Sequence, residues 1–249
     1  MTGDVVISEL GKARLEDMAR AADEIAEVYR LLAKTSGNVV GQVLANQGTF
    51  YEWDHYPSGD VYDGGTFSQY YYHAHRGTDG ENGHFHTFLR SGGMPAGIWP
   101  APYEGEGERP LGNDALAHII AISMNREGYP IALFTTNRWV TGETFYSADS
   151  VIAMLDRFLI DHTFPCLAAN NWISAMIRLF RPQIAVLLRQ RDQEIERWQA
   201  AHPGEDVYED RDLEVTSSIR ISVKDQAAAV KKALAEGPVE NLFLNSSWG

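Results

Sequence analysis

The chain has 249 residues and a single cysteine, Cys166. One thiol excludes an internal disulfide framework, and it also excludes zinc and iron–sulfur sites built from several cysteines. Positive charge is the next scarce feature, because 21 Lys and Arg stand against 34 Asp and Glu, for a formal net charge of −13. An acidic chain without a basic block argues against binding to nucleic acid or to an anionic membrane.

The sequence also lacks the usual targeting and enzyme signatures. It has no apolar stretch of about 18 residues, which predicts no transmembrane helix. The first residues, MTGDVVISELGK, contain no basic segment followed by an apolar run, which predicts no secretion signal and favours a cytoplasmic protein. A glycine-rich phosphate loop, a Gly-x-Ser-x-Gly elbow and a His-Glu-x-x-His helix are all missing.

Histidine is concentrated in one stretch of the chain. Four of the eight histidines form two His-x-His pairs, His73 with His75 and His84 with His86. Each pair lies in a run of aromatic and β-branched residues, which is typical of a strand. The intervening segment RGTDGENG is rich in glycine and predicts a turn. We therefore expect a β-hairpin with an eight-residue connection.

Alternation along the strands makes this hairpin a candidate metal centre. Successive strand residues point to opposite faces, so the two members of each pair share a face. If His75 lies opposite His84, and His73 lies opposite His86, all four imidazoles project from one side of the sheet. Directly opposed β-carbons are about 5 Å apart, which allows imidazole nitrogens to converge on one ion at about 2.0–2.1 Å. A one-residue slip in register would separate the two pairs.

Three charged side chains are candidates for catalysis, two in the histidine hairpin and one, Arg138, after a later strand. Glu81 lies in the connection and can serve as a metal ligand or as an acid or base. Arg90 shares the parity of His84 and His86. Arg90 and Arg138 can each pair with a substrate carboxylate, and a structural salt bridge is the alternative role for both.

The histidine cluster also has two interpretations without a metal, a proton-transfer cluster and a purely structural cluster. His118 lies on an expected apolar strand and is a further candidate ligand, although core packing is the commoner role of such a histidine. Asp54 and His55 belong to the aromatic segment FYEWDHYPSGDVYDGG and are spare candidates for a ligand or a base. This segment either closes over a pocket or packs as a surface loop.

The whole chain, residues 1–249, is expected to form a single α+β domain. A long amphipathic helix is predicted over residues 8–35, and a histidine-bearing sheet built from hairpins over about 66–137. A helical region interrupted by a proline is predicted over about 147–201, and a strand and a helix over 213–236. This order of elements favours an antiparallel sheet flanked by the N-terminal and C-terminal helices.

Two resemblances involve the histidine stretch. The segment HAHRGTDGENGHFHTF resembles an uncharacterised bacterial family, a domain of unknown function, and that resemblance implies no activity. The pattern His73-x-His75 followed by Glu81 is similar to the first metal motif of the cupins. Glu81 is one residue further along than in the usual cupin pattern, and a second His-x-His pair follows at once. The flanking helices also do not suit a plain jelly roll.

Together these patterns predict a metal-dependent enzyme that acts on a small molecule. Imidazole suits iron, copper and zinc. Fe(II) is the favoured ion, and copper and zinc are the alternatives. A non-haem oxygenase or related oxidoreductase is the leading interpretation. A zinc-dependent hydrolase or lyase with Glu81 as base is the second, and a non-catalytic metal- or cofactor-binding module is the third. The oligomeric state is left open, with a homo-oligomer among the outcomes.

Overall fold

A computed structural model describes residues 5–75 and 80–237. Within these residues, six strands form one sheet whose order follows the chain, and each neighbouring pair is antiparallel. The strands are β1 (Tyr56–Tyr62), β2 (Ser68–His73), β3 (Gly83–Arg90), β4 (Leu116–Met124), β5 (Pro130–Thr136) and β6 (Val215–Arg220). The predicted α+β fold with an antiparallel sheet is therefore confirmed.

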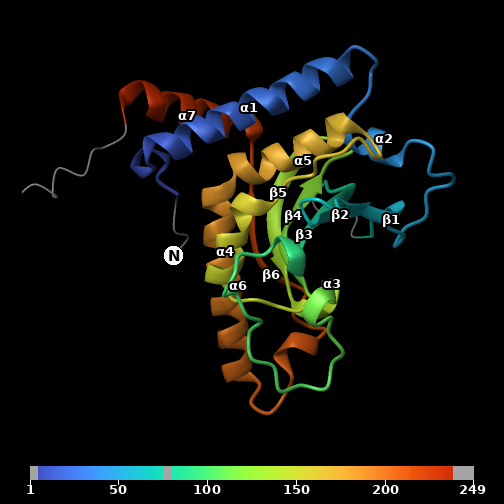
Figure 1. Cartoon of the computed structure of the whole chain (residues 1–249), viewed down its shortest axis with the longest axis vertical. Helices are drawn as coiled ribbons and strands as arrows, with labels where there is room; N and C mark the ends of the chain where they lie inside the picture. Colours follow the sequence, from blue (N-terminus) through green and yellow to red (C-terminus); the bar gives the residue numbers. More distant parts are fainter. Residues whose placement is uncertain (1–4, 76–79, 238–249) are drawn as a thin grey trace, which may run out of the picture.

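Helices pack along one side of this sheet and across one of its ends (Figure 1). They are α1 (Lys12–Ala33), α2 (Val39–Leu44), α3 (Arg138–Thr141), α4 (Ala148–Met154), α5 (Leu167–Leu179), α6 (Arg181–Ala201) and α7 (Val223–Glu236). Short 3-10 turns cover Ile7–Glu9, Ser91–Gly93, Gly112–Asp114, Leu155–Arg157 and Val207–Glu209. In the part of the chain that is described, no helix combines the length and the apolar character needed to cross a lipid bilayer.

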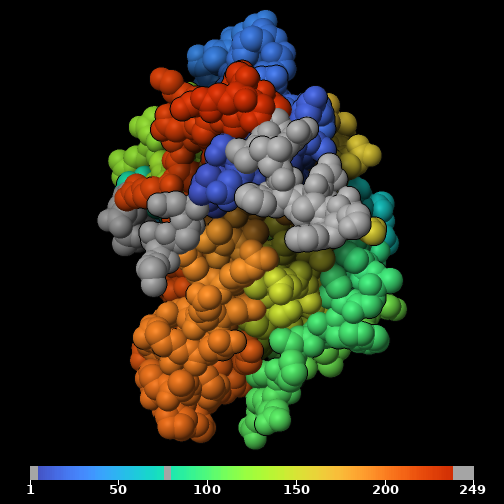
Figure 2. All heavy atoms as spheres, turned by 90° about the vertical axis from the view of Figure 1, so that its left-hand side faces the viewer, coloured from blue at the N-terminus to red at the C-terminus, as the bar shows by residue number. Residues whose placement is uncertain are grey.

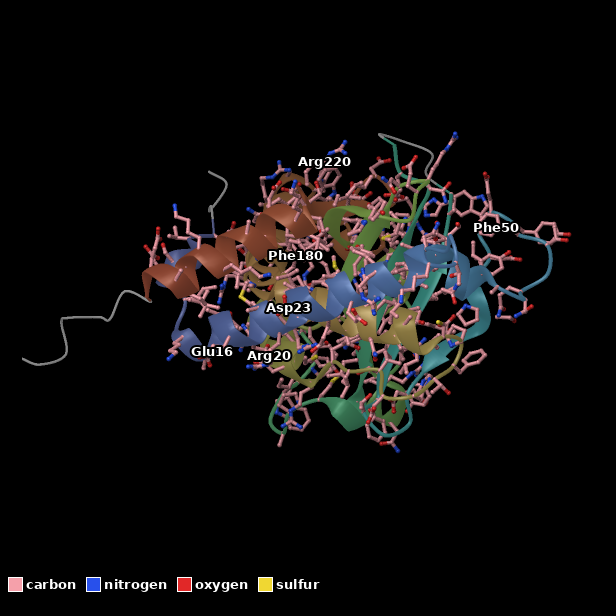
Figure 3. The ribbon with its side chains drawn as sticks, turned by 90° about the horizontal axis from the view of Figure 1, so that it is seen from above. Glu16, Arg20, Asp23, Phe50, Phe180 and Arg220 are labelled. Carbon is pink, nitrogen blue, oxygen red and sulfur yellow. The ribbon has the colours of Figure 1, made fainter. Side chains whose placement is uncertain are left out.

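The helix α1 forms because apolar residues recur along it every three or four positions. Its buried face carries Leu15, Met18, Ala21, Ala22, Ile25, Val28 and Leu32. The helix begins at Lys12, four residues later than predicted, because Ile7–Glu9 forms a separate 3-10 turn. Figures 2 and 3 show α7 lying beside α1 on the outer surface, so the first and last helices form one layer.

Pro182 separates two helices, as the sequence predicts. The helix α5 ends at Leu179, and α6 begins at Arg181 with Pro182 in its first turn. Proline is tolerated there because the first backbone N–H groups of a helix have no partner within the helix. The resulting break lets α5 pack against α1 while α6 runs down the side of the sheet (Figure 1).

The two faces of the sheet have different roles. On the face that packs against the helices, the Tyr70 hydroxyl donates to Asn170 Oδ1 at 2.7 Å, and the Phe85 ring contacts Trp172 of α5. The alternate residues of β2 and β3 point to the opposite face. That second face carries the histidines of both strands, and it is the face on which the candidate site lies.

The strand β1 was not predicted. Its sequence YPSGDVY is rich in turn-forming residues, and we expected a loop there. Proline and glycine are tolerated because β1 is an edge strand, where a missing hydrogen-bond donor faces outward. Its pairing with β2 is also irregular between Tyr56 and Val61, so the strand shows no regular alternation in the sequence.

Candidate metal centre

The strands β2 and β3 bring the two histidine pairs together, in a register that differs from the predicted one. His73 lies opposite His84, and Tyr71 lies opposite His86. The predicted pairing of His75 with His84 is therefore wrong by two residues. A shift of two residues preserves the side-chain parity, so all histidines of β2 and β3 still share one face. The predicted turn over RGTDGENG falls partly on residues 76–79, which lie outside the described residues.

Three histidines converge at the end of the hairpin. His73, His75 and His84 each offer one ring nitrogen, and these nitrogens all lie within 4.8 Å of one another. The Nε2 atoms of His73 and His84 are 2.9 Å apart. Two nitrogens bound at about 2.0–2.1 Å to one ion lie about 2.9 Å apart when the bond angle is near 90°. The three imidazoles therefore fit a single transition-metal ion with small adjustments.

Glu81 occupies the position of an outer-shell carboxylate. Its Oε1 lies 2.8 Å from Nδ1 of His84, and its Oε2 accepts a hydrogen bond from the Ser123 hydroxyl. Donation from Nδ1–H to the carboxylate leaves the lone pair of His84 on Nε2, the atom that faces His73. Glu81 thus favours the His84 tautomer with its proton on Nδ1, which is the arrangement found behind metal-bound histidines.

His86 lies next to this group and is completely buried. Its Nδ1 is 3.0 Å from Nε2 of His118 on β4, whereas its own Nε2 has no hydrogen-bond partner among the described residues. Burial holds the pKa of His86 well below its ordinary value and lowers the pKa of His118 to about 3. Both rings are therefore neutral near pH 7. His86 is not part of the group whose nitrogens all lie within 4.8 Å of one another.

Aromatic rings surround the three histidines. The Trp53 ring stacks on His75 with a centroid separation of 4.3 Å, and the His55 ring stacks on Tyr71 at 3.6 Å. On the other side, the Phe134 ring contacts His84 edge-on at 5.2 Å. The aromatic segment before β1 thus packs directly against the candidate centre, which supports its interpretation as a cover over a pocket.

Arg90 lies on the histidine face but belongs to a chain of hydrogen bonds at its edge. Its Nε donates to Gln69 Oε1 at 2.6 Å, and the Gln69 amide donates to Asp60 Oδ2 at 2.6 Å. The other oxygen of Asp60 is 3.2 Å from Nδ1 of His55. This chain connects Arg90 to the ring that stacks on Tyr71, so Arg90 is positioned to hold the cover.

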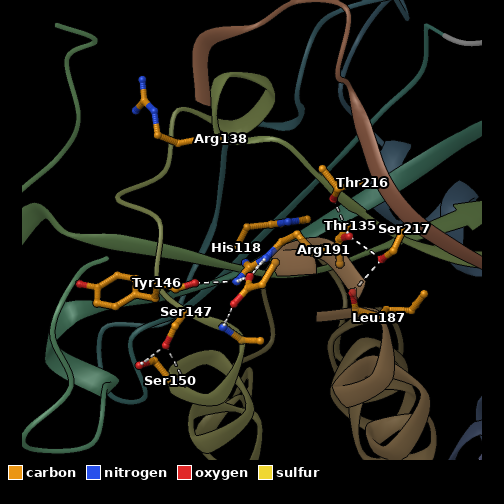
Figure 4. Close-up of polar contacts among 12 residues, drawn as sticks. His118, Thr135, Arg138, Tyr146, Ser147, Ser150, Leu187, Arg191, Thr216 and Ser217 are labelled. Carbon is orange, nitrogen blue, oxygen red and sulfur yellow. Dashed lines mark hydrogen bonds and ion pairs between the residues drawn. The ribbon is translucent and has the colours of Figure 1, made fainter. Parts of the chain in front are cut away.

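Arg138 lies elsewhere and has structural partners. Its guanidinium pairs with Glu209, with Nε to Oε1 at 2.8 Å, and it donates to the backbone oxygens of Glu108 and Glu143. Figure 4 shows Arg138 set apart from His118 and Arg191. These contacts match the structural alternative considered for Arg138, because they hold the 101–114 connection against the turn at Val207–Glu209.

Glu143 and Arg191 form a buried polar region near His118, and Figure 4 shows Arg191 next to His118. Glu143 Oε2 accepts the His118 backbone N–H at 2.7 Å, and Arg191 donates to the Tyr146 carbonyl and to Asp192. Burial raises the pKa of Glu143 to about 7. No sequence pattern indicated this region, because Glu143 and Arg191 are far apart in the chain and meet only through packing.

Two surface hollows border the centre. One, of about 590 Å³, is lined by residues that include Glu52, His75, Glu81 and Glu127. The other, of about 470 Å³, is lined by residues that include Glu81, Ser123 and Phe134. Glu81 lies on the border of both hollows, and the first one also reaches His75. Ser123 gave no sequence signal, since its role depends on its position opposite His84 across β3 and β4.

Comparison with known sequences places the chain in a family. The model of a family described as a domain of unknown function, DUF6969, matches residues 19–221. Since this match covers most of the chain, the protein belongs to that family, in agreement with the resemblance of its histidine stretch to an uncharacterised family. No curated protein and no solved structure gives a significant match. The similarity to the cupin motif receives no support from these comparisons.

Proposed function

We propose that this protein is a metal-dependent enzyme that holds one transition-metal ion with His73, His75 and His84. The observation that carries the proposal is the convergence of three imidazole nitrogens within 4.8 Å of one another on one face of the sheet. The Glu81 carboxylate on Nδ1 of His84 adds to it, because ligating histidines characteristically donate their second N–H to such a group.

The proposed ligand set favours a catalytic centre over a closed structural site. Three neutral histidines leave at least one coordination position for substrate, water or dioxygen. Structural zinc sites usually have four protein ligands. The adjoining hollows near Glu81 and His75 give a small molecule room to reach that open position. These features support an enzyme more than a passive metal-binding module.

Among reaction classes, dioxygen-dependent oxidation remains the leading proposal, with Fe(II) as the favoured ion and copper as the next. Imidazole ligands suit iron and copper, and the bound ion would supply the redox chemistry. The chain's own contribution is an aromatic lining, in which buried Tyr71 and Phe134 contact the histidines and the exposed Trp53 ring stacks on His75.

The alternative is a zinc-dependent hydrolase or lyase. In that mechanism a carboxylate must be free to take a proton from bound water. Both oxygens of Glu81 are engaged, one with His84 and one with Ser123. This arrangement argues against Glu81 as the base and therefore favours the oxidative alternative.

Oxygen consumption distinguishes the two classes. Protein reconstituted anaerobically with Fe(II), Cu or Zn would be screened against small carboxylic and aromatic compounds, with oxygen uptake and product formation measured in parallel. We expect uptake that depends on both substrate and Fe(II) or Cu, and its loss in His84→Ala. Turnover by the zinc form under strict anaerobiosis would reject the oxidative proposal in favour of hydrolysis or elimination.

A further inference from the structure

The proposed three-ligand centre does not include His86, the fourth histidine of β2 and β3 and their connection. His86 is fully buried between Tyr71 and His118, with ring centroids 5.2 Å and 5.0 Å away. Its Nε2 is buried and has no hydrogen-bond partner among the described residues. A buried polar atom without a partner is energetically costly, so it needs an explanation.

The hydrogen bonds behind His86 determine which of its nitrogens carries the proton. Nδ1 of His86 and Nε2 of His118 are 3.0 Å apart, so one of the two atoms carries the proton. A proton on Nε2 of His118 would make the buried Nε2 of His86 an N–H donor without an acceptor. Ligation through Nε2 of His86 requires the other arrangement, in which Nε2 of His118 accepts Nδ1–H from His86.

The position of this proton also decides the state of the other His86 nitrogen. With the His86 proton on Nδ1, the unpartnered Nε2 of His86 carries a lone pair. This is the arrangement found behind metal-bound histidines, in which an outer-shell acceptor fixes the tautomer of the ligand. Glu81 has that relation to His84 through Nδ1 at 2.8 Å, and His118 has it to His86 through Nδ1 at 3.0 Å.

We propose that His86 is a further nitrogen ligand of the same metal centre and that His118 is its positioning residue. The proposal rests on the proposed metal centre and deepens it. With four histidine ligands, the position open to substrate would be the fifth or sixth one of a five- or six-coordinate ion. The His86 ring centroid is 4.9 Å from that of His84 and 5.5 Å from that of His73, so a modest rotation of the rings brings Nε2 toward the shared ion. Ligation also gives the buried Nε2 the partner that it lacks.

Through its contact with His86, the buried His118 extends the proposed centre from β3 to the neighbouring strand β4. His118 lies 1% exposed on β4 and opposite Phe88, so its ring is held by packing. Truncating it would remove the acceptor for Nδ1–H of His86 and release the ring to adopt the other tautomer. Loss of an outer-shell partner typically lowers metal affinity by about 10- to 100-fold.

The test is nitrogen NMR of the histidine rings in uniformly ¹⁵N-labelled full-length protein, with Zn²⁺ as a diamagnetic probe. In the metal-free protein, His86 is expected to show a protonated Nδ1 and an unprotonated Nε2. One equivalent of Zn²⁺ should shift the Nε2 resonances of His84 and His86 together. An unshifted His86 Nε2 resonance in a protein that binds zinc through the other histidines would overturn the proposal and leave the three-ligand centre intact.

Variants of His118 provide the second measurement. His118→Met removes the acceptor, so we expect a 10- to 100-fold weaker zinc affinity and the opposite tautomer at His86. His118→Gln keeps an oxygen near the position of Nε2 and should restore most of the affinity. His202→Met, remote from the site, is the matched control. Equal affinity in His118→Met and native protein would reject the positioning role, and absence of zinc binding in native protein would reject the centre itself. If His118→Met does not fold, the NMR shift in the native protein decides.

Discussion

The Nε2 atoms of His73 and His84 face each other at 2.9 Å across the pair of strands β2 and β3. His84 donates through its Nδ1 to Glu81, so its Nε2 presents a lone pair to His73. Two imidazole lone pairs at this distance repel unless a proton or a cation lies between them. A neutral His73 with its proton on Nε2 meets this condition by donating to His84, and a bound metal ion would meet it in place of that proton.

Metal content is the first test of this relationship. Protein purified without a histidine tag and without chelator should contain close to one transition-metal ion per chain by elemental analysis. His73→Ala, His75→Ala and His84→Ala should each reduce the metal content severely, because each removes one of the three converging nitrogens. His202→Ala should retain full occupancy. Less than about a tenth of an equivalent in native protein, even after incubation with iron, copper and zinc, would contradict the centre.

Replacement of Glu81 by glutamine separates an outer-shell role from base catalysis. The amide can still accept from His84, but the negative charge is lost, so we expect metal affinity to fall by about tenfold. Glu127→Gln changes a carboxylate in the lining of the same hollow and should leave affinity unchanged. Unchanged affinity in Glu81→Gln, with turnover reduced by about 10²–10⁴-fold, would instead identify Glu81 as the general base.

Trp53 should report metal binding through its stacking on His75. Cu²⁺ bound by His75 is a strong quencher at such short range, so the tryptophan fluorescence of native protein should fall on titration with Cu²⁺. In Trp53→Phe most of that decrease should disappear while the copper stoichiometry stays the same. Trp99→Phe is the control, because Trp99 is exposed in a different connection. Equal quenching in native and Trp53→Phe protein would show that copper binds elsewhere.

The pKa of Glu143 predicts how the stability of the fold depends on pH. Burial raises this pKa from 4.5 to about 7, so between these pH values the folded chain binds more protons at Glu143 than the unfolded chain. The contribution of Glu143 to the free energy of unfolding is therefore fully present at low pH. It falls by up to about 3 kcal/mol as the pH rises through 7.

Glu143→Gln should remove that loss. Urea unfolding of metal-free protein at pH 5 and pH 8 would be compared between native and variant, since the difference cancels the titration of the histidines. We expect the variant to gain stability relative to native protein between these pH values, by about 2–3 kcal/mol. Glu196→Gln, an exposed carboxylate of α6, should show no such change. A constant difference between Glu143→Gln and native protein would contradict the shifted pKa.

Arg138 should matter for stability and leave metal binding unaffected. Its side chain is 4% exposed and pairs with Glu209, which is 28% exposed. Removing one partner of a fully buried pair costs about 3–5 kcal/mol, and the partial exposure of Glu209 reduces this to about 2–3 kcal/mol for Arg138→Met. Urea unfolding and zinc titration on the same variant would measure both effects. Weaker zinc binding by a variant with unchanged stability would show instead that Arg138 takes part in metal binding.

The order of the residues was enough to predict the periodic elements and the shared face of the histidines. The apolar spacing of α1, the break at Pro182 and the alternation in β2 and β3 are local properties, so they are readable from the order of residues. The prediction that both His-x-His pairs share one face was correct although the predicted register was wrong, because a shift of two residues keeps every side chain on its own face.

Which histidines meet, and which residues lie behind them, depends on the folded chain as a whole. The register of β2 on β3 depends on the packing of whole faces, and it paired His73 with His84. His118 reached His86 because β4 pairs with β3, and Glu81 and Ser123 met across the same strands. These contacts join residues up to 42 positions apart, and no local pattern encodes them, because their geometry follows from the pairing of strands and the packing of the helices on the other face.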